Sequence, residues 1–391
     1  MDTIAGFWNR IQATLFPHLL ANLPQPLTEQ EEQLVAILEI VRIEEFVGRA
    51  NWRGRPPADR GALGRSFLAK AVYNLPTTKA LRAALCAAPN LRRLCGFERL
   101  DQVPSEATFS RSFSAFAAPE LLERVHQALV KQHLGDELIG HISRDSTEVE
   151  ARETVAPEPA PEPPTPPEGE SEPAPELVPE PPAPAAAPVE PATKPRRGRG
   201  RPRTRTAPEP PTRLEQQRQQ TPEQALAEIA TDCSWGGKLD SHGNRHYWKG
   251  YKFHVDVMDA VLPLTAVTTA AKVHDSQVAI PLAKRSAQRV TGLYELMDKG
   301  YDAAAIDQAV RDLGHVPIIA HNRRRGNKRP PLEPAVQQRF KERTAVERFF
   351  SRLKDEFGGR QVRVRGHDKV HAHLMFGLLA LFADQLLKLV T

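Results

Sequence analysis

The sequence predicts a mixed α/β domain, residues 133–391, that follows an all-helical amino-terminal domain, residues 1–132. Two observations carry this prediction. Apolar residues recur at helical spacing from about residue 28 to 132, with almost no alternating pattern. From residue 138 onward, short apolar or alternating runs typical of strands are separated by helical stretches. At 391 residues, the chain is long enough for two domains that each bury a core.

An insertion interrupts the α/β domain between residues 155 and 213. Its first part is dominated by proline, glutamate and alanine, and its second part reads KPRRGRGRPRTR. Repeated proline removes backbone donors, and so few apolar side chains cannot offset the entropy lost on ordering. We therefore expect a disordered insertion that leaves the domain from a surface connection.

The helical domain carries one well-marked helix start. Ser105 is a good amino-terminal cap, and Phe109, Phe113 and Phe116 follow at spacings that place them on one face. Arg111 projects near this helix, and further arginines precede it. One interpretation is a helix-turn-helix that lies against DNA, and the other is an ordinary helical bundle with scattered arginines.

The element order within the α/β domain is strand, strand, strand, helix, strand, helix, strand, helix. This is the order of a ribonuclease H-like fold, a mixed sheet with helices on its faces. The predicted strands are 138–144, 245–259, 262–270, 293–297 and 315–321, and the predicted helices are 276–288, 303–313 and 334–357, with a helical lead-in at 221–229.

Charge and cysteine content narrow the class of protein. The formal net charge is +5, and the basic residues are concentrated in a few stretches, which favours a polyanionic partner. Three widely separated cysteines favour neither a disulfide framework nor a zinc site and fit a reducing cytosol. No secretory signal is apparent at the start. The apolar carboxyl-terminal stretch contains Asp384 and Lys388, so we expect a helix in the protein core rather than in a membrane.

Three carboxylates fall where a metal-dependent phosphodiester enzyme would need them. Asp145 and Asp298 each follow a predicted strand, and Glu347 lies in a helix with Arg343 and Lys354 at spacings of four and seven. Carboxylates from separate elements can converge on two divalent ions. Taken singly, each has an ordinary explanation: a strand end, a helix cap, or an exposed helix with ion pairs.

The segment RFKERTAVERFFSRLKDEF resembles the signature of bacterial insertion-sequence transposases of the DDE type. In that signature a tyrosine is followed after two residues by arginine, after three more by glutamate and after six more by lysine. Arg343, Glu347 and Lys354 match, whereas Phe340 replaces the tyrosine. SRDST, MDKGYDA, YWKGYKFHVDV and KVHDSQVAIPL are similar to other parts of the same catalytic domain, and LCGFERLDQVPSEATFSRSF is similar to the helical amino-terminal region.

The resemblance implies an enzyme that cleaves transposon-end DNA and joins the 3′ hydroxyl to target DNA. Asp145, Asp298 and Glu347 would bind two Mg²⁺ or Mn²⁺ ions, and Arg343 and Lys354 would hold phosphates of the transposon end. The partners implied are terminal inverted repeats and target DNA, with a homodimer assembled on DNA in the bacterial cytoplasm, associated with the nucleoid. Only about 49 positions (347 − 298) separate the last two carboxylates, which leaves no room for an inserted β-rich domain.

Two further stretches are candidates for DNA contact. Trp248 lies among aromatic residues and lysines in YWKGYKFH and could stack on a flipped base, although an ordinary strand with one buried face would look the same. Arg199 and Arg201 lie in an Arg-Gly-Arg-Pro sequence that resembles an AT-hook for the minor groove, although any basic tract would bind DNA nonspecifically.

Two other functions remain compatible with these residues. One is a catalytically inactive or domesticated DNA-binding protein derived from a transposase, which the unusual insertion suggests. The other is a ribonuclease H-like nuclease that cuts DNA without joining strands.

Overall fold

The helical amino-terminal region consists of short helices. The computed structural model describes residues 26–47, 58–118, 120–155, 211–239, 243–322 and 332–390. Thr28 and Ser105 each accept a hydrogen bond from a backbone amide in the first turn of the helix that they precede, as the sequence predicts for Ser105. The elements are α3 (Glu29–Val41), η1 (Ile43–Glu45), α4 (Arg60–Val72), α5 (Thr78–Ala87), α6 (Pro89–Leu94), η2 (Leu100–Gln102), α7 (Glu106–Phe116) and α8 (Leu121–Leu134). Of these, α3, α4, α5 and α7 begin at a side-chain cap.

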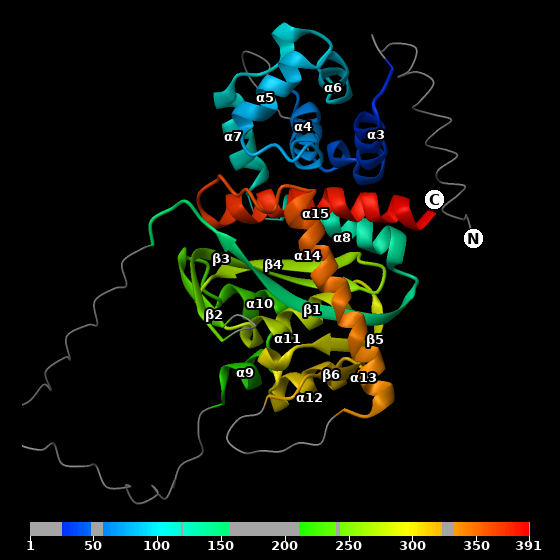
Figure 1. Ribbon diagram of the computed structural model, residues 1–391, viewed down its shortest axis with the longest axis vertical. Helices are drawn as coiled ribbons and strands as arrows, with labels where there is room; N and C mark the ends of the chain where they lie inside the picture. The colour runs from blue at the N-terminus through cyan, green and yellow to red at the C-terminus, as the bar shows by residue number, and fades with distance from the viewer. Residues whose placement is uncertain are drawn as a thin grey trace, which may run out of the picture. The chain divides into compact units, whose positions relative to one another are not determined.

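A mixed sheet with helices on its faces follows (Figure 1), which confirms the predicted fold class. Its strands are β1 (Leu138–Glu150), β2 (Ser234–Leu239), β3 (Arg245–Met258), β4 (Pro263–Ala270), β5 (Thr291–Met297) and β6 (Val316–Ile319). The spatial order is β2-β3-β1-β5-β6, and β4 also pairs with β3. Strand β1 is antiparallel to β3 and parallel to β5, so it lies at the centre of the sheet.

The helices of the α/β part agree with the predicted element order. They are α9 (Arg213–Gln219), α10 (Pro222–Ala227), α11 (Ser276–Ala287), η3 (Lys299–Tyr301), α12 (Ala304–Asp312), α13 (Pro334–Phe340), η4 (Lys341–Arg343), α14 (Thr344–Asp355) and α15 (His367–Val390). The helix predicted at 334–357 is divided by one 3₁₀ turn, η4. Strand β2 and helix α9 are absent from the prediction. The insertion prediction falls mainly on residues 156–210, outside the described residues.

Helix α15 is a core helix, as predicted from its interrupting polar residues. It is long and apolar enough to cross a membrane, but 83% of its apolar window is buried inside the protein. It packs against α3 and α4 on one side and against β4 on the other (Figure 1). The Phe376 ring contacts Phe67, Phe113 and Phe116 of the helical region. One continuous apolar core therefore joins the helical region to the sheet.

Because two histidines are buried, we expect the fold to lose stability in mild acid. Burial lowers the pKa of His126 to about 4 and that of His373 to about 3. Lys70 Nζ approaches His373 Nδ1 at 3.4 Å, which favours a neutral ring there. An unfolded histidine has a pKa of about 6.5, so the unfolded chain binds more protons below that pH. The contribution of these neutral histidines to the free energy of unfolding is complete above pH 6.5 and is lost as the pH falls toward 4.

We expect each of these histidines to cost about 2 kcal/mol of unfolding free energy by pH 5. The measurement is urea unfolding at pH 5 and pH 7.5 for the wild type and for His373→Asn, with exposed His274→Asn as the control. Between pH 7.5 and pH 5, His373→Asn should lose about 2 kcal/mol less unfolding free energy than the wild type. An unchanged loss would mean that His373 is not held neutral.

Candidate active site

Two of the three predicted carboxylates lie on neighbouring strands of the sheet. Arg144 of β1 pairs with Met297 of β5 in parallel register, so the residues that follow, Asp145 and Asp298, are adjacent. Strand β1 continues past Asp145, whereas Asp298 follows the last residue of β5 and accepts a hydrogen bond from the Gly300 amide at 2.7 Å. A Cβ on residue 300 would lie 2.9 Å from Asp298 Oδ1, so glycine keeps this turn open.

Asp145 is held in an environment that opposes its negative charge. Burial raises the pKa of the Asp145 carboxyl to about 6, and the nearby Asp298 carboxylate adds to this effect. The Ser146 amide, which donates to Asp145 Oδ1 at 2.8 Å, and the Arg343 guanidinium act in the opposite direction. In this environment a nearby cation stabilises the ionised form of the carboxylate.

Arg343 connects the first and third carboxylates. Its guanidinium donates to Asp145 Oδ2 at 2.8 Å and to Glu347 Oε1 at 2.5 Å. The turn η4 places Arg343 one helical turn before Glu347, and Ser143 of β1 donates to the Glu342 carbonyl at 3.3 Å, which fixes this turn against the strand. The Glu347 side chain is 55% exposed, whereas that of Arg343 is 21% exposed.

The donor set of these residues suits a hard divalent ion only in part. Asp145 and Asp298 are adjacent carboxylates, and the Arg343 guanidinium forms ion pairs with both Asp145 and Glu347. Oxygen ligands of this kind are those that Mg²⁺ and Mn²⁺ prefer. Among the residues that the structure describes, however, no three acidic, histidine or cysteine side chains form a group that could hold a metal ion. Binding by all three carboxylates requires Arg343 to leave them.

A buried ion network on the strands beneath Asp145 holds β1 in place. Arg144 donates to both carboxylate oxygens of Asp256 on β3, at 2.8 and 2.7 Å, and forms an ion pair with Glu295 on β5 at 2.9 Å. Ser286 donates to Asp256, and His315 bonds to Glu295. Because one side chain ties three strands together, this network fixes the position of the Asp145 backbone.

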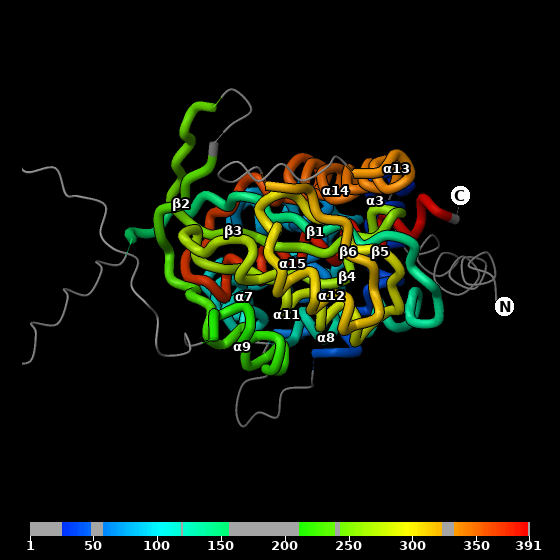
Figure 2. The backbone as a smooth tube through the Cα atoms, turned by 90° about the horizontal axis from the view of Figure 1, so that it is seen from below, coloured from blue at the N-terminus to red at the C-terminus, as the bar shows by residue number. Residues whose placement is uncertain are grey.

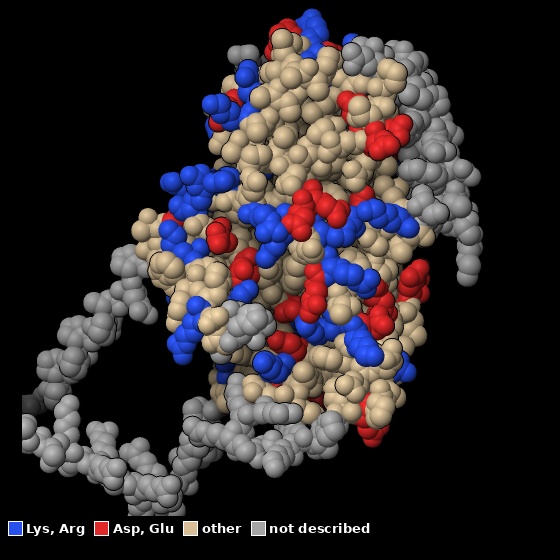
Figure 3. Space-filling view, in the orientation of Figure 1, with Lys and Arg blue, Asp and Glu red and all other residues tan. Residues whose placement is uncertain are grey.

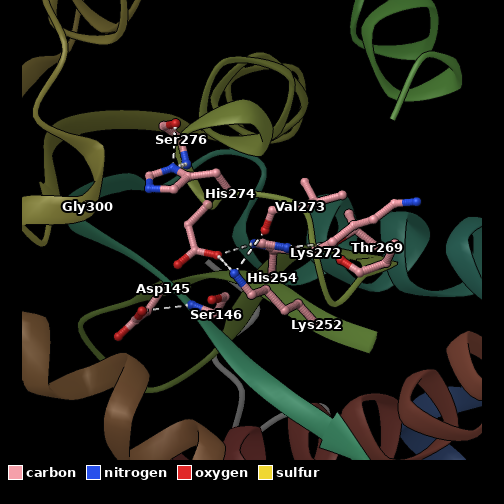
Figure 4. Close-up of polar contacts among 12 residues, drawn as sticks. Asp145, Ser146, Lys252, His254, Thr269, Lys272, Val273, His274, Ser276 and Gly300 are labelled. Atoms are coloured by element: carbon pink, nitrogen blue, oxygen red, sulfur yellow. Dashed lines mark hydrogen bonds and ion pairs between the residues drawn. The ribbon is translucent and has the colours of Figure 1, made fainter. Parts of the chain in front are cut away.

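A second polar group lies beside Asp145 (Figure 4). Lys252 donates to Asp275 and to the Val273 carbonyl, each at 2.9 Å. The ring of His254 is bonded to Thr269 at 2.9 Å, and burial lowers its pKa to about 4. These contacts link β3, β4 and the start of α11, so the group holds these elements together next to the site.

The remaining predicted DNA-binding residues lie in different parts of the chain. Lys354 lies on α14 near Glu148 and Lys238, and burial lowers the pKa of its ammonium. Arg111 is exposed on α7, where its Nε donates to the Ala107 carbonyl of its own helix at 3.3 Å. Arg199 and Arg201 lie outside the described residues.

Trp248 does not suit the stacking role expected of it. Its side chain is only 4% exposed, and its indole N–H donates to the Tyr251 carbonyl at 3.1 Å. The exposed aromatic side chains on the same pair of strands are Trp235 and Tyr247, which sequence reasoning missed. The alternation along RHYWKGYKFH does signal two faces, but it does not say which face is buried.

Charged side chains concentrate over the catalytic part of the face drawn in Figure 3. Lys, Arg, Asp and Glu are interspersed across its middle, over α14 and the sheet, whereas most of the helical region above is uncharged on this face. Basic and acidic groups are thus mixed over this part of the surface.

Comparison with known proteins gives two family matches. Residues 202–383 match the family described as Transposase DDE domain, and residues 23–115 match the family described as Transposase domain (DUF772). The first match includes Asp298, Glu347 and Lys354 but begins at residue 202, within the insertion, so Asp145 lies outside it. No curated protein and no solved structure gave a significant match.

Proposed function

The chain belongs to the DDE transposases of insertion sequences, and on that premise we propose how its own residues cleave and join DNA. Enzymes of this class cut DNA, transfer strands and generally use divalent metal ions. We assign the ions, as two Mg²⁺ or Mn²⁺, to Asp145, Asp298 and Glu347. When bound, they would supply positive charge to both the attacking and the leaving oxygen of an in-line displacement.

The single observation that carries this assignment is the Arg343 bridge. One guanidinium contacts Asp145 on β1 and Glu347 at the start of α14, so these two carboxylates already face a common positive charge. When Arg343 leaves them, its planar fork is free to bind a phosphate with two hydrogen bonds. Lys354 lies further along the same helix, next to β1, and would contact a second phosphate.

The substrates that we propose are the terminal inverted repeats of the element and a target duplex. Binding would involve the helical region, with Arg111 on an exposed helix face, and the basic tract that contains Arg199 and Arg201. We also propose a homodimer when two ends are paired, and a location in the cytoplasm at the nucleoid. No finding favours the alternative of an inactive, domesticated DNA-binding protein.

We expect Glu347→Gln to lower Mn²⁺-supported cleavage of element-end DNA at least 100-fold, because the change removes one carboxylate charge and keeps the side-chain shape. The measurement is release of a labelled 3′ end from a duplex that carries the element terminus. Glu356→Gln, at the end of the same helix, is the matched control and should cleave like the wild type.

The same reaction separates the remaining functions. Adding a supercoiled target tests strand joining, because a nuclease would release ends without transferring them. Equal cleavage by wild type and Glu347→Gln would contradict the assigned site, and a wild type that binds end DNA without cutting it would contradict the proposed activity.

A further inference from the structure

Strands β2 and β3 form a hairpin that extends beyond the rest of the sheet. The pairing runs from Ser234 opposite Gly250 to Leu239 opposite Arg245, past the point where β1 pairs with β3. Figure 2 shows this hairpin projecting from the body of the protein. Its part beyond β1 therefore has neighbours mainly within the hairpin itself.

The two faces of the hairpin differ sharply. On one face, Trp248 lies opposite Gly236, and a Cβ at residue 236 would come within 2.5 Å of the Trp248 ring. Glycine thus lets this indole pack flat against the backbone. The other face presents Trp235 and Tyr247, which are 60% and 58% exposed. The Tyr247 ring lies over Gly237, its cross-strand partner, where a side chain would crowd it.

Cations accompany the exposed rings. Directly opposite residues of an antiparallel pair share a face, so Lys249 lies beside Trp235. Arg245, two residues before Tyr247 on the same strand, donates to the Tyr247 hydroxyl at 3.3 Å. Flat rings with adjacent cations are suited to nucleic acid, because the rings contact bases or sugars while the cations neutralise phosphates.

The register gives the distance from this face to the catalytic site. Asp145 pairs with Val255, and Tyr247 lies eight residues from Val255 along β3. At about 3.3 Å per residue, that is roughly 26 Å, or about seven to eight base pairs of duplex. Lys354, on α14, lies near Glu148, whose partner Lys252 is between these two points on β3. A duplex held at the carboxylates can therefore reach the hairpin.

We propose that the exposed face made by Trp235, Arg245, Tyr247 and Lys249 binds double-stranded DNA about seven to eight base pairs from the cleaved phosphate. This inference rests on the proposed function, because it takes the DNA to be the substrate held at the carboxylates. The two rings offer about 400 Å² of apolar surface at most. A stable dimer buries about 800 Å² on each partner, so this face alone is too small and too charged to be a dimer interface.

The test compares binding to long and short DNA. Full-length wild type and the double variant Trp235→Ala/Tyr247→Ala are titrated with DNA in the presence of EDTA. The DNA is a 40-base-pair end duplex or one of two shorter duplexes. Each shorter duplex is cut off five base pairs from the cleavage site, one on each side. We expect the variant to bind the long duplex about tenfold more weakly than the wild type does. Both proteins should bind the duplex that lacks the contacted side equally. Leu138→Ala, a similarly exposed apolar residue at the other end of β1, is the control and should bind like the wild type.

Arg245→Ala supplies a second readout on an exposed residue at the surface of the hairpin. It should reduce the slope of log affinity against log salt by about 0.9 on the long duplex only. Equal binding of the long duplex by wild type and both variants would overturn the proposal. So would a change in the sedimentation of the DNA-free protein, which would identify the hairpin as a contact between copies. Failure of the wild type to cleave would instead contradict the proposed function and leave this comparison of binding intact.

Discussion

Asp145→Asn is expected to abolish DNA cleavage, by about 10³-fold or more, while it stabilises the metal-free protein. The catalytic loss follows because a divalent ion contributes several kcal/mol of transition-state stabilisation and an amide is a poor substitute for the carboxylate. The gain in stability follows because the Asp145 charge is partly buried and lies next to Asp298. Asparagine fills the same space and can still accept from the Ser146 amide.

The measurement is thermal unfolding in EDTA at pH 7.5, together with end cleavage in Mn²⁺. The melting temperature of Asp145→Asn should exceed that of the wild type by a few degrees, whereas Asp307→Asn, at an exposed ion pair on α12, should change it little. Added Mn²⁺ should raise the melting temperature of the wild type more than that of Asp145→Asn. A destabilised Asp145→Asn with intact cleavage would show that the Arg343–Asp145 pair is only structural.

Arg144→Met should destabilise the fold by about 3–5 kcal/mol, because it leaves Asp256 and Glu295 as buried charges without their common partner. The three side chains are 0–1% exposed, so water cannot replace the lost ion pairs. Urea unfolding monitored by circular dichroism measures this loss. Arg311→Met, which removes an exposed pair with Asp307, should change stability by no more than about 1 kcal/mol.

A contrasting variant separates charge from packing. If burial of unpaired carboxylates is the cause, Arg144→Met combined with Asp256→Leu and Glu295→Leu should recover part of the lost stability. A triple variant less stable than Arg144→Met would show that the network contributes through its hydrogen bonds to Ser286 and His315.

The fold was predictable where local pattern and tertiary structure agree. The alternation from Arg245 to Met258 and the apolar run from Pro263 to Ala270 gave β3 and β4, and the turn between them needed only local residues. Strand β2 was missed because Gly236 and Gly237 weaken its strand pattern. The reason for glycine there is the Trp248 ring on the neighbouring strand, a contact that sequence spacing does not show.

The site was predictable in its residue types but not in its contacts. Strand ends indicated Asp298, and helical spacing placed Arg343 and Glu347 together. That Arg343 also reaches Asp145, 198 residues earlier, depends on the packing of η4 against β1. The buried face of β3 was likewise decided by pairing, which is why Trp248 was expected on the wrong face and Tyr247 was overlooked.

We assign the ions that cleave DNA to the carboxylates of Asp145, Asp298 and Glu347. The most direct measurement is end cleavage by Asp298→Cys in Mg²⁺ and in Mn²⁺. A thiolate is a poor ligand for Mg²⁺ and a better one for Mn²⁺, so a metal-binding position should show a change in metal requirement. We predict cleavage near background in Mg²⁺ and clear recovery in Mn²⁺, with wild type active in both. Equal activity of Asp298→Cys in the two metals, whether high or absent, would contradict the assignment of Asp298 as a metal ligand.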